Sequence, residues 1–253
     1  MTKDKRMAIF GLGSMGLGVG NSLLRAGILA RGCAVGTPAE IASDLSTVIT
    51  VVLNAAQPED VLFGKPGIVP LLPSGAVVIS CATVAPEFAR AMETRCNDHG
   101  VFYLDAPISG GSVKASAGQL SIMAAGSQSA FDAAKPALDA ISETVFDLGR
   151  QAGSGSAMKA VNQLLAGVHI AAMSEAITFG MTQGVAPEAF LNVIKNCAGT
   201  SWMLENRAPH IVEGDYTPHS QVNIWPKDLG IVLDIARSAG FSAPLTATAF
   251  QQY

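Results

Sequence analysis

A glycine-rich turn near the N-terminus constrains the fold of this chain more than any other feature. Residues 11–16 read Gly-Leu-Gly-Ser-Met-Gly, between the apolar run Ala8–Phe10 and a helix-like segment, Met15–Ala26. In a strand–turn–helix unit the first glycine permits a tight turn, the second lets backbone approach a pyrophosphate, and the third lets helix and strand pack closely. The helix N-terminus also presents free N–H groups to phosphates. We therefore expect a dinucleotide site formed by Gly11, Leu12, Gly13, Ser14, Met15 and Gly16. Because a chain with 26 glycines can match this motif by chance, the alternative is a tight turn without a ligand.

Short apolar runs alternate with helix-like segments over the first part of the chain. The further strand candidates are residues 48–53, 76–79 and 101–104, and residues 119–124 and 144–146 are candidate edge strands. The first three runs are almost continuously apolar, which is typical of strands buried on both faces of a parallel sheet. The alternation predicts an α/β fold with a Rossmann-type, doubly wound parallel sheet.

The pattern changes after Gly149. Gly153-Ser-Gly155 forms a flexible joint, and residues 156–184 contain no strand-like run, so we expect one long helix there. Shorter helices are expected over residues 187–196 and 227–238, with a brief turn over residues 202–206. We predict two domains: a dinucleotide-binding Rossmann domain over residues 1–152, and an all-helical substrate and oligomerisation domain over residues 153–253.

The composition excludes several classes of protein. The chain has 253 residues, of which 49% are hydrophobic and 14% charged, and its net charge is −4. This is too apolar for a disordered chain and too acidic to favour a nucleic-acid surface. The four cysteines form no CxxC pair and have no metal-ligand spacing, so we expect a reduced, cytoplasmic protein without a metal site. The charge-free stretch 160–174 is shorter than the ~20 residues of a membrane span, so we expect no membrane segment.

The second strand lacks the residue that usually reads the ribose. Dinucleotide folds carry an acidic residue ~20 positions after the glycine turn. Here no Asp or Glu occurs from Leu29 to Pro38, and the first is Glu40. Arg31 lies near the end of this strand and could accept a phosphate. We favour NAD as the cofactor and keep NADP as an alternative.

Four motifs together resemble a known family. They are Gly11–Gly16, Asp105-Ala-Pro-Ile-Ser-Gly-Gly111, Gly155-Ser-Ala-Met-Lys159-Ala-Val-Asn162-Gln163 and Lys227-Asp228-Leu-Gly230. In this order they resemble the β-hydroxyacid dehydrogenases, the group of 3-hydroxyisobutyrate dehydrogenase. Within that family, Cys81–Pro86 and Cys197–Trp202 look most like the L-threonate dehydrogenases.

The resemblance implies a role for each matching position. Lys159 matches the catalytic lysine, and Asn162 and Gln163 lie where the family places an amide one turn later. The family's loop for the substrate carboxylate is matched by Ser109, Gly110 and Gly111. Positions near the cofactor's ribose and nicotinamide are matched by Asn54, Thr83 and Lys227.

The residues themselves support this chemistry. Lys159, Asn162 and Gln163 are spaced i, i+3 and i+4, on one face of the long helix. A lysine in an apolar helix is expected to be partly desolvated, which lowers its pKa toward neutrality and allows it to exchange the alcohol proton during hydride transfer. The alternatives are a snorkelling lysine, an ordinary loop at residues 109–111, and a solvated charge at Lys227; Asp228 receives no role.

These features predict an NAD(P)-dependent oxidoreductase acting on a small hydroxy acid, which the resemblance narrows to the oxidation of L-threonate to the keto acid. The alternatives are a tartronate semialdehyde or succinic semialdehyde type of reductase, and a dinucleotide-binding module without catalysis. Since a helix that is apolar nearly all round should be buried on all sides, we expect a homodimer or homotetramer formed through the helical domain.

The family pattern fails at one junction. A parallel crossover needs a dozen or more residues, and the family places an acidic residue and a full helix after the second strand. No such helix follows Cys33, so we expect a stretch of chain to be missing between Cys33 and Ala34, by deletion or by omission. Residues 250–253 likewise end inside an expected terminal helix.

Overall fold

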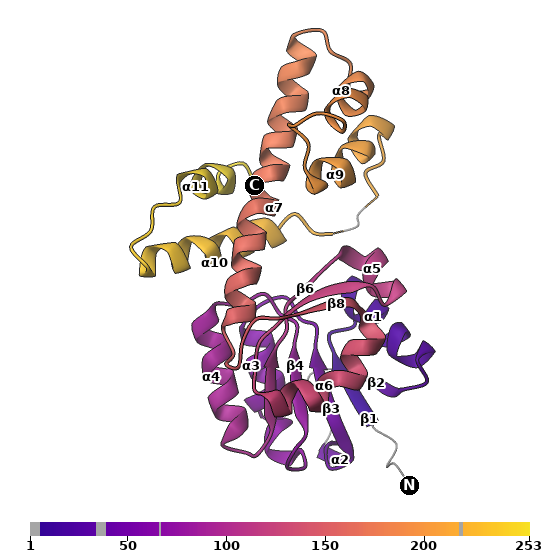
Figure 1. The fold of residues 1–253 in the computed structure, drawn as a ribbon, viewed down its shortest axis with the longest axis vertical. Coiled ribbons are helices and arrows are strands. Elements are labelled where there is room, and N and C mark those ends of the chain that lie inside the picture. The colour runs from indigo at the N-terminus through magenta and orange to yellow at the C-terminus, as the bar shows by residue number, and fades with distance from the viewer. Residues whose placement is uncertain (1–5, 34–38, 66, 218–219) are drawn as a thin grey trace. The chain divides into compact units, whose positions relative to one another are not determined.

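The computed structural model describes residues 6–33, 39–65, 67–217 and 220–253. It divides into two compact units, Met1–Lys159 and Ala160–Tyr253, while the sequence predicted a boundary after residue 152. One long helix, α7 (Ser154–Thr182), begins in the first unit and continues into the second (Figure 1).

The first unit is built on a five-stranded parallel sheet. Its strands are β1 (Arg6–Phe10), β2 (Leu29–Cys33), β3 (Leu45–Thr50), β4 (Val77–Ser80) and β5 (Phe102–Asp105), in the order β2-β1-β3-β4-β5. Side chains of β1 alternate between two cores: Met7 and Ile9 lie in one, and Ala8 and Phe10 in the other. A sheet buried on both faces is the reason for the continuous apolar runs in the sequence, and it confirms the doubly wound fold.

Helices cover both faces of this sheet (Figure 1). The core around Met7 includes side chains of α1 (Ser14–Arg25) and α6 (Gln128–Ile141). The core around Phe10 includes side chains of α3 (Ala56–Phe63) and α4 (Pro86–Asn97). Two short helical segments, α2 (Ala39–Ala42) and the 3₁₀ turn η1 (Val69–Leu71), lie in the connections between strands.

The predicted edge strands are present, but they form a sheet of their own. It contains β6 (Ile108–Ser109), β7 (Leu120–Ala124) and β8 (Ser142–Asp147), with α5 (Gly111–Ala117) between the first two. After β5 the chain makes a single antiparallel bridge between Asp105 and Ala125, and this bridge links the two sheets.

Strand β3 begins and ends three residues earlier than the predicted run 48–53. The ladder ends near Val51, whose N–H donates to the carbonyl of Phe10 at 2.8 Å. Val51 and Val52 then support the glycine turn, since a Cβ on Gly11 would overlap both of them. The apolar run 48–53 therefore has two causes: its first residues are buried in β3, and Val51 and Val52 pack against the glycine turn.

The crossover from β2 to β3 is short. It spans residues 34–44, of which the described part, 39–44, contains the four-residue α2, and the strands that it joins lie on opposite sides of β1. The Cys33–Ala34 junction, where we predicted missing chain, lies outside the described residues.

The second unit is helical, as predicted. After α7 come α8 (Pro187–Ile194), α9 (Trp202–Glu213), α10 (Ile224–Ser238) and α11 (Pro244–Phe250). Met173 and Ile177 of α7 pack with Phe190, Leu204 and Ala208. Because Leu204 and Ala208 are buried there, α9 continues through Pro209 to Glu213, and the prediction of a brief turn over residues 202–206 was wrong.

Helix α10 lies against α7 at a glycine. A Cβ on Gly167 would come within 2.8 Å of Leu229, and the Tyr253 hydroxyl donates to the Gly167 carbonyl at 2.7 Å. Within the described part of the chain, α7 is the one helix long and apolar enough to cross a membrane by length and composition.

Candidate active site

The predicted site residues of the first unit follow the carboxyl ends of its parallel strands. The glycine turn follows β1, Asn54 follows β3 and Thr83 follows β4, while Ser109 lies in β6, the next strand along the chain after β5. The chain leaves β1 toward β2 on one side, whereas β3 lies on the other side. Ligands of open α/β sheets bind at such a switch point, outside the carboxyl ends of the strands.

The glycine turn has the shape that a pyrophosphate needs. Gly11 adopts φ +92°, and a Cβ on Gly16 would overlap the carbonyl oxygen of Gly11. A Cβ on Gly13 would have no neighbour within 4 Å, so this face of the loop is open. Gly13 is also the N-cap of α1, whose first N–H groups have no partner within the helix. The loop therefore fits a dinucleotide.

The other residues of the turn divide into two sets. Leu12 and Ser14 are exposed, whereas Met15 is half-buried and packs against the core beneath the sheet. The side chain of Met15 thus supports the loop, and its backbone remains part of the helix N-terminus.

Two predicted cofactor residues lie at helix starts. The Asn54 side chain accepts from the N–H of Gln57 at 3.2 Å, and the Gln57 side chain accepts from the N–H of Leu53 at 2.7 Å. This reciprocal arrangement caps the start of α3 and holds Asn54 exposed at the sheet edge. Thr83 is half-buried in the loop before α4.

The predicted carboxylate loop has a backbone that requires glycine. Gly110 and Gly111 adopt φ +133° and +73°, and both follow the half-buried Ser109. Successive glycines with exposed N–H groups beside a hydroxyl make a suitable cradle for an anionic group.

Lys159 meets this loop inside the first unit. Its side chain is only 7% exposed, and Nζ donates to the carbonyl of Ile108 at 2.9 Å. A snorkelling lysine would keep its ammonium in water, so this alternative does not describe Lys159. The ammonium lies one residue away from Ser109.

Asp105, which had no predicted role, holds the start of α7. Its buried carboxylate accepts from the N–H of Gly153 and from the N–H and hydroxyl of Ser156, at 2.7–2.8 Å. Burial raises the pKa of Asp105, and these hydrogen bonds oppose that shift.

A second cluster of polar side chains is buried in the second unit. Gln163 Nε2 donates to Asp228 Oδ2 at 2.5 Å, while Gln163 Oε1 accepts from Asn162 at 2.9 Å. Lys227 Nζ lies 2.5 Å from Asp228 Oδ1. The side chain of Lys227, for which a solvated charge was the alternative, is 23% exposed and is paired with Asp228, which had no predicted role and is 2% exposed. The place of Asp228 in the Lys227-Asp228-Leu-Gly230 motif was the available signal.

Comparison with known proteins identifies the family. Residues 153–253 match the family described as NAD-binding of NADP-dependent 3-hydroxyisobutyrate dehydrogenase, and residues 28–149 match the NAD binding domain of 6-phosphogluconate dehydrogenase. The chain is 45% identical to an L-threonate dehydrogenase of Cupriavidus necator over 266 residues, covering 99% of this chain and 90% of the relative. The chain belongs to the β-hydroxyacid dehydrogenase family.

Other members agree in sequence and in structure. An L-threonate dehydrogenase of Escherichia coli K12 is 40% identical, with 98% of this chain and 87% of the relative covered. The crystal structure of a 3-hydroxyisobutyrate dehydrogenase from Salmonella typhimurium superimposes with a TM-score of 0.91 at 39% identity, over 98% of this chain and 92% of that one. The alignment of 266 residues also exceeds the 253 of this chain, so the Cupriavidus relative has residues without a counterpart here.

Membership of the β-hydroxyacid dehydrogenases settles the general activity. The chain is an NAD(P)-dependent oxidoreductase that acts on a small hydroxy acid. The open face at Gly13 and the uncapped start of α1 agree with this cofactor.

Proposed function

We propose that this dehydrogenase oxidises L-threonate, or a closely similar aldonate, to the keto acid. The observation that carries the proposal is the buried Lys159 side chain, whose Nζ donates to the Ile108 carbonyl beside the Ser109 loop. Relatives at 40–45% identity over nearly the whole chain are L-threonate dehydrogenases, which supports this substrate.

The proposed reaction gives each residue a separate task. Ser109, Gly110 and Gly111 bind the substrate carboxylate, and Gln163 orients the hydroxyl group. The neutral amine of Lys159 takes the hydroxyl proton while the C–H bond of the carbinol breaks and the C=O bond forms. Bound NAD(P) supplies the acceptor for the hydride of that C–H bond. In the reverse direction, the Lys159 ammonium donates the proton to the carbonyl oxygen.

The cofactor residues are proposed on their position at the sheet edge. Residues 11–16 bind the pyrophosphate, Asn54 and Thr83 lie toward the ribose and nicotinamide, and Lys227 serves the nicotinamide end.

Replacing Lys159 tests the mechanism. We expect Lys159→Ala to lower kcat by about 100-fold or more, which is the usual contribution of a positioned acid or base. The Kd of the cofactor, measured by fluorescence titration, is expected to stay within about twofold because the glycine turn is intact. Lys135→Ala, at an exposed ion pair of α6, is the matched control. Wild-type turnover in Lys159→Ala would show that the mechanism is wrong.

A substrate panel tests the choice of reaction. Turnover should be highest for L-threonate with one of the two cofactors, NAD or NADP, in the oxidative direction. Preferred reduction of tartronate or succinic semialdehyde would favour the reductase alternative. Cofactor binding without turnover of any hydroxy acid would favour a non-catalytic module.

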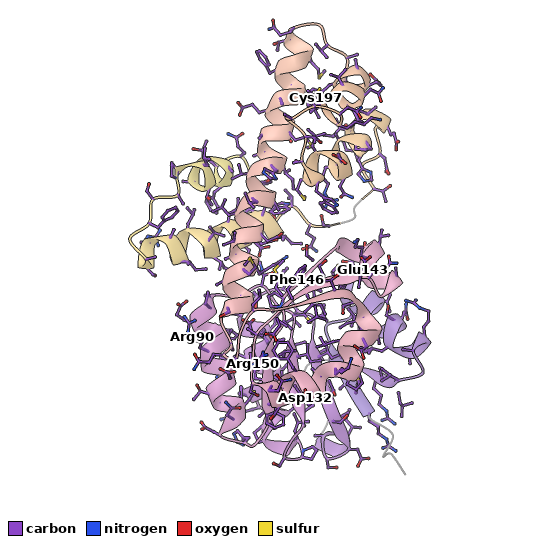
Figure 2. All side chains as sticks on the ribbon, in the orientation of Figure 1. Arg90, Asp132, Glu143, Phe146, Arg150 and Cys197 are labelled. Carbon is purple, nitrogen blue, oxygen red and sulfur yellow. The ribbon has the colours of Figure 1, made fainter. Side chains whose placement is uncertain are left out.

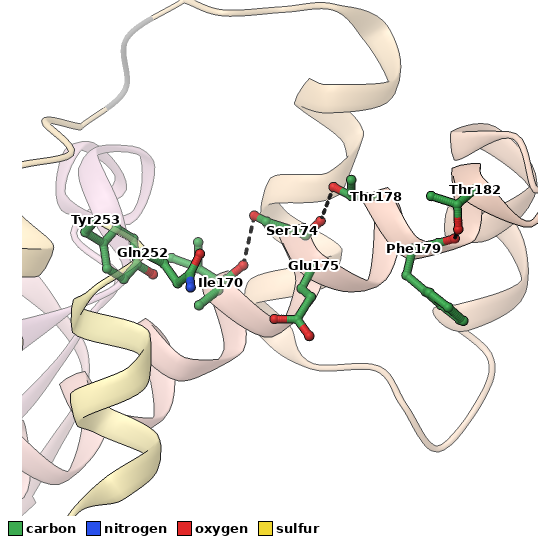
Figure 3. A pocket seen from close by; sticks show the side chains of 9 residues that line it. Ile170, Ser174, Glu175, Thr178, Phe179, Thr182, Gln252 and Tyr253 are labelled. Carbon is green, nitrogen blue, oxygen red and sulfur yellow. Dashed lines mark hydrogen bonds between the residues drawn. The ribbon is translucent and has the colours of Figure 1, made fainter.

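We propose further that a second copy of this chain covers α7. Only 17% of the most apolar 18-residue stretch of α7 is buried. The side chains of Val161, Leu165 and Phe179 on this helix are each at least 50% exposed. A groove of about 540 Å³ runs along this helix, lined by Ile170, Ser174 and Thr178, with Gln252 and Tyr253 at one end (Figure 3). Burial against another protein copy accounts for this exposed apolar surface.

The oligomeric state tests this surface. Leu165→Glu and Phe179→Glu should each shift the wild-type dimer or tetramer toward monomer in analytical ultracentrifugation, because a charge at a buried apolar contact is costly. Val193→Glu places the same charge on exposed α8 and should leave the mass unchanged. A monomeric wild-type protein would contradict the proposal.

A further inference from the structure

Two hydrogen-bonded connections join α7 to the preceding strands, one from its first turn to the last residue of β5 and the other from its second turn to the first residue of β6. Asp105 bonds to Ser156, and Ile108 bonds to Lys159. In each pair the partners are 51 residues apart, so the two connections have the same register. From Asp105 to Ile108 the chain advances three residues, and from Ser156 to Lys159 it also advances three residues.

The sheet end of the first connection is rigid. The Asp105 N–H donates to the Ala125 carbonyl at 3.0 Å, and the Ala125 N–H donates to the Asp105 carbonyl at 2.8 Å. Asp105 is therefore bonded to a β-strand by its backbone and to a helix start by its side chain. Its carboxylate is 1% exposed, so water does not compete for these donors.

The helix end of this connection fits closely against the strand. A Cβ on Gly155 would lie 2.8 Å from the Asp105 carbonyl oxygen and would overlap that of Met123. The bare Cα lets α7 approach until Asp105 Oδ2 accepts from the N–H of Gly153, just before the helix, and from the N–H of Ser156 in its first turn. These bonds fix both the position of α7 along its axis and its rotation.

Rotation of α7 decides where the amine of Lys159 lies. Ser156 and Lys159 are three residues apart, and such residues occupy one face of a helix. A side chain with four carbon atoms in its stem can reach many points, and only a fixed Cα together with the Ile108 carbonyl selects one of them.

We propose that Asp105 is a positioning residue for Lys159: through Ser156 and Gly153 it sets the start of α7, so that the Lys159 amine meets the reacting hydroxyl. This inference rests on the proposed role of Lys159. Asp105 does not exchange a proton with the substrate.

Variants of the connection separate positioning from folding. Asp105→Ala removes the acceptor and should lower kcat by about 100-fold, since a misplacement near 1 Å has effects of that order. Asp105→Asn should restore kcat to within about fivefold of wild type, because one oxygen still accepts from the N–H groups and the amide can donate to Ser156. Ser156→Ala keeps the backbone bonds and should have an intermediate effect, which Ser156→Thr reverses.

Kinetics, cofactor binding and thermal unfolding together distinguish a positioning role of Asp105 from a role in folding alone. We expect kcat to fall while the KM of the hydroxy acid and the Kd of the cofactor stay within about twofold, and while the protein unfolds cooperatively above the assay temperature. Glu93→Gln is the matched control, because Glu93 accepts from the N–H of Ala152, just before α7, and is not hydrogen-bonded to Ser156 or Gly153 in the described contacts. Its kcat should equal that of the wild type.

Two results would contradict the positioning role of Asp105, and a third would contradict the proposed role of Lys159. If kcat in Asp105→Ala and Ser156→Ala falls no further than in Glu93→Gln, Asp105 does not position Lys159. The same conclusion follows if kcat falls only together with cofactor binding and thermal stability. Wild-type turnover in Lys159→Ala would instead refute the proposed mechanism, whatever Asp105 does.

Discussion

Few of the described charged side chains of this protein are buried, and each buried one is held by a polar partner. Among the described residues, the buried charged ones are Asp105, Lys159 and Asp228. Other charges lie at the surface, as Arg90, Glu143 and Arg150 do (Figure 2). A buried charge is costly unless it is paired or hydrogen-bonded, and each of these three has such a partner.

Asp228 is expected to orient Gln163. In Asp228→Asn the charge opposite Lys227 is lost, and Gln163 Nε2 and Lys227 Nζ, which now bind separate oxygens, must compete for the single remaining oxygen. Hydrogen bonds to charged groups contribute about 1.5–3 kcal/mol, so kcat/KM for the hydroxy acid should fall roughly 10-fold or more. Steady-state kinetics measures this. Asp234→Asn, at an exposed pair on the same helix, is the control, and equal kinetics of the two variants would contradict this role.

Motifs predicted which residues carry the chemistry but not what holds them. Lys159 and Gln163 could be found because their spacing places them on one helix face. Their partners, Ile108 and Asp228, lie 51 and 65 residues away along the chain. No local pattern encodes a contact at that separation, so the clusters became visible only in the folded structure.

The strands and helices could be predicted from the sequence, but some of their boundaries could not. Runs buried on both faces of the sheet were recognisable from sequence, because burial repeats along each strand. The starting residue of β3 was not, since Thr47 is polar although it is buried, and the length of α9 was not, since Pro209 resembles a helix end. In both cases tertiary packing overrides local preference.

The turn between β1 and α1 allows a matched pair of substitutions. Gly16→Ala should lower the free energy of unfolding by about 1–3 kcal/mol, because the new Cβ overlaps the Gly11 carbonyl. This cost exceeds the gain of up to about 1 kcal/mol in helix propensity. Gly13→Ala should leave stability unchanged, since its Cβ meets nothing within 4 Å, and should weaken cofactor binding where the pyrophosphate approaches.

Urea unfolding and cofactor titration of both variants check this pair. Equal stability of Gly16→Ala and Gly13→Ala would contradict the close contact between the turn and its helix. Unchanged cofactor affinity in Gly13→Ala would contradict the proposed path of the phosphates.

The stability of the whole molecule should depend on the pH through Asp105. Burial raises the pKa of Asp105 above the ordinary value of 3.8, so the native state binds this proton more tightly than the unfolded state does. The contribution is fully present below that ordinary pKa and is lost as the pH rises through the native pKa. The stability of the wild type relative to Asp105→Asn should therefore fall as the pH rises above about 4.

Comparison with Asp105→Asn separates the effect of Asp105 from that of carboxyl groups whose pKa is lowered in the native state. Hydrogen bonds from Arg150 lower the pKa of Asp147, and those from Thr217 lower the pKa of Asp215 to about 2, so both stabilise the fold as the pH rises. These groups are present in both proteins and cancel in the difference. Urea unfolding between pH 4 and 8 measures it; a difference that grows with pH would contradict the predicted direction.

The bonds from Asp105 to the start of α7 also have a consequence for biosynthesis. A ribosome delivers chains from the N-terminus, and domains generally fold as units in that order. Strand β5 is therefore translated before residues 153–156, and the acceptor for the first N–H groups of α7 can be in place when these donors emerge. The order of translation thus matches the order of assembly. A circular permutant that begins at α7 would reverse this order and would have to nucleate its longest helix before the carboxylate that caps it exists.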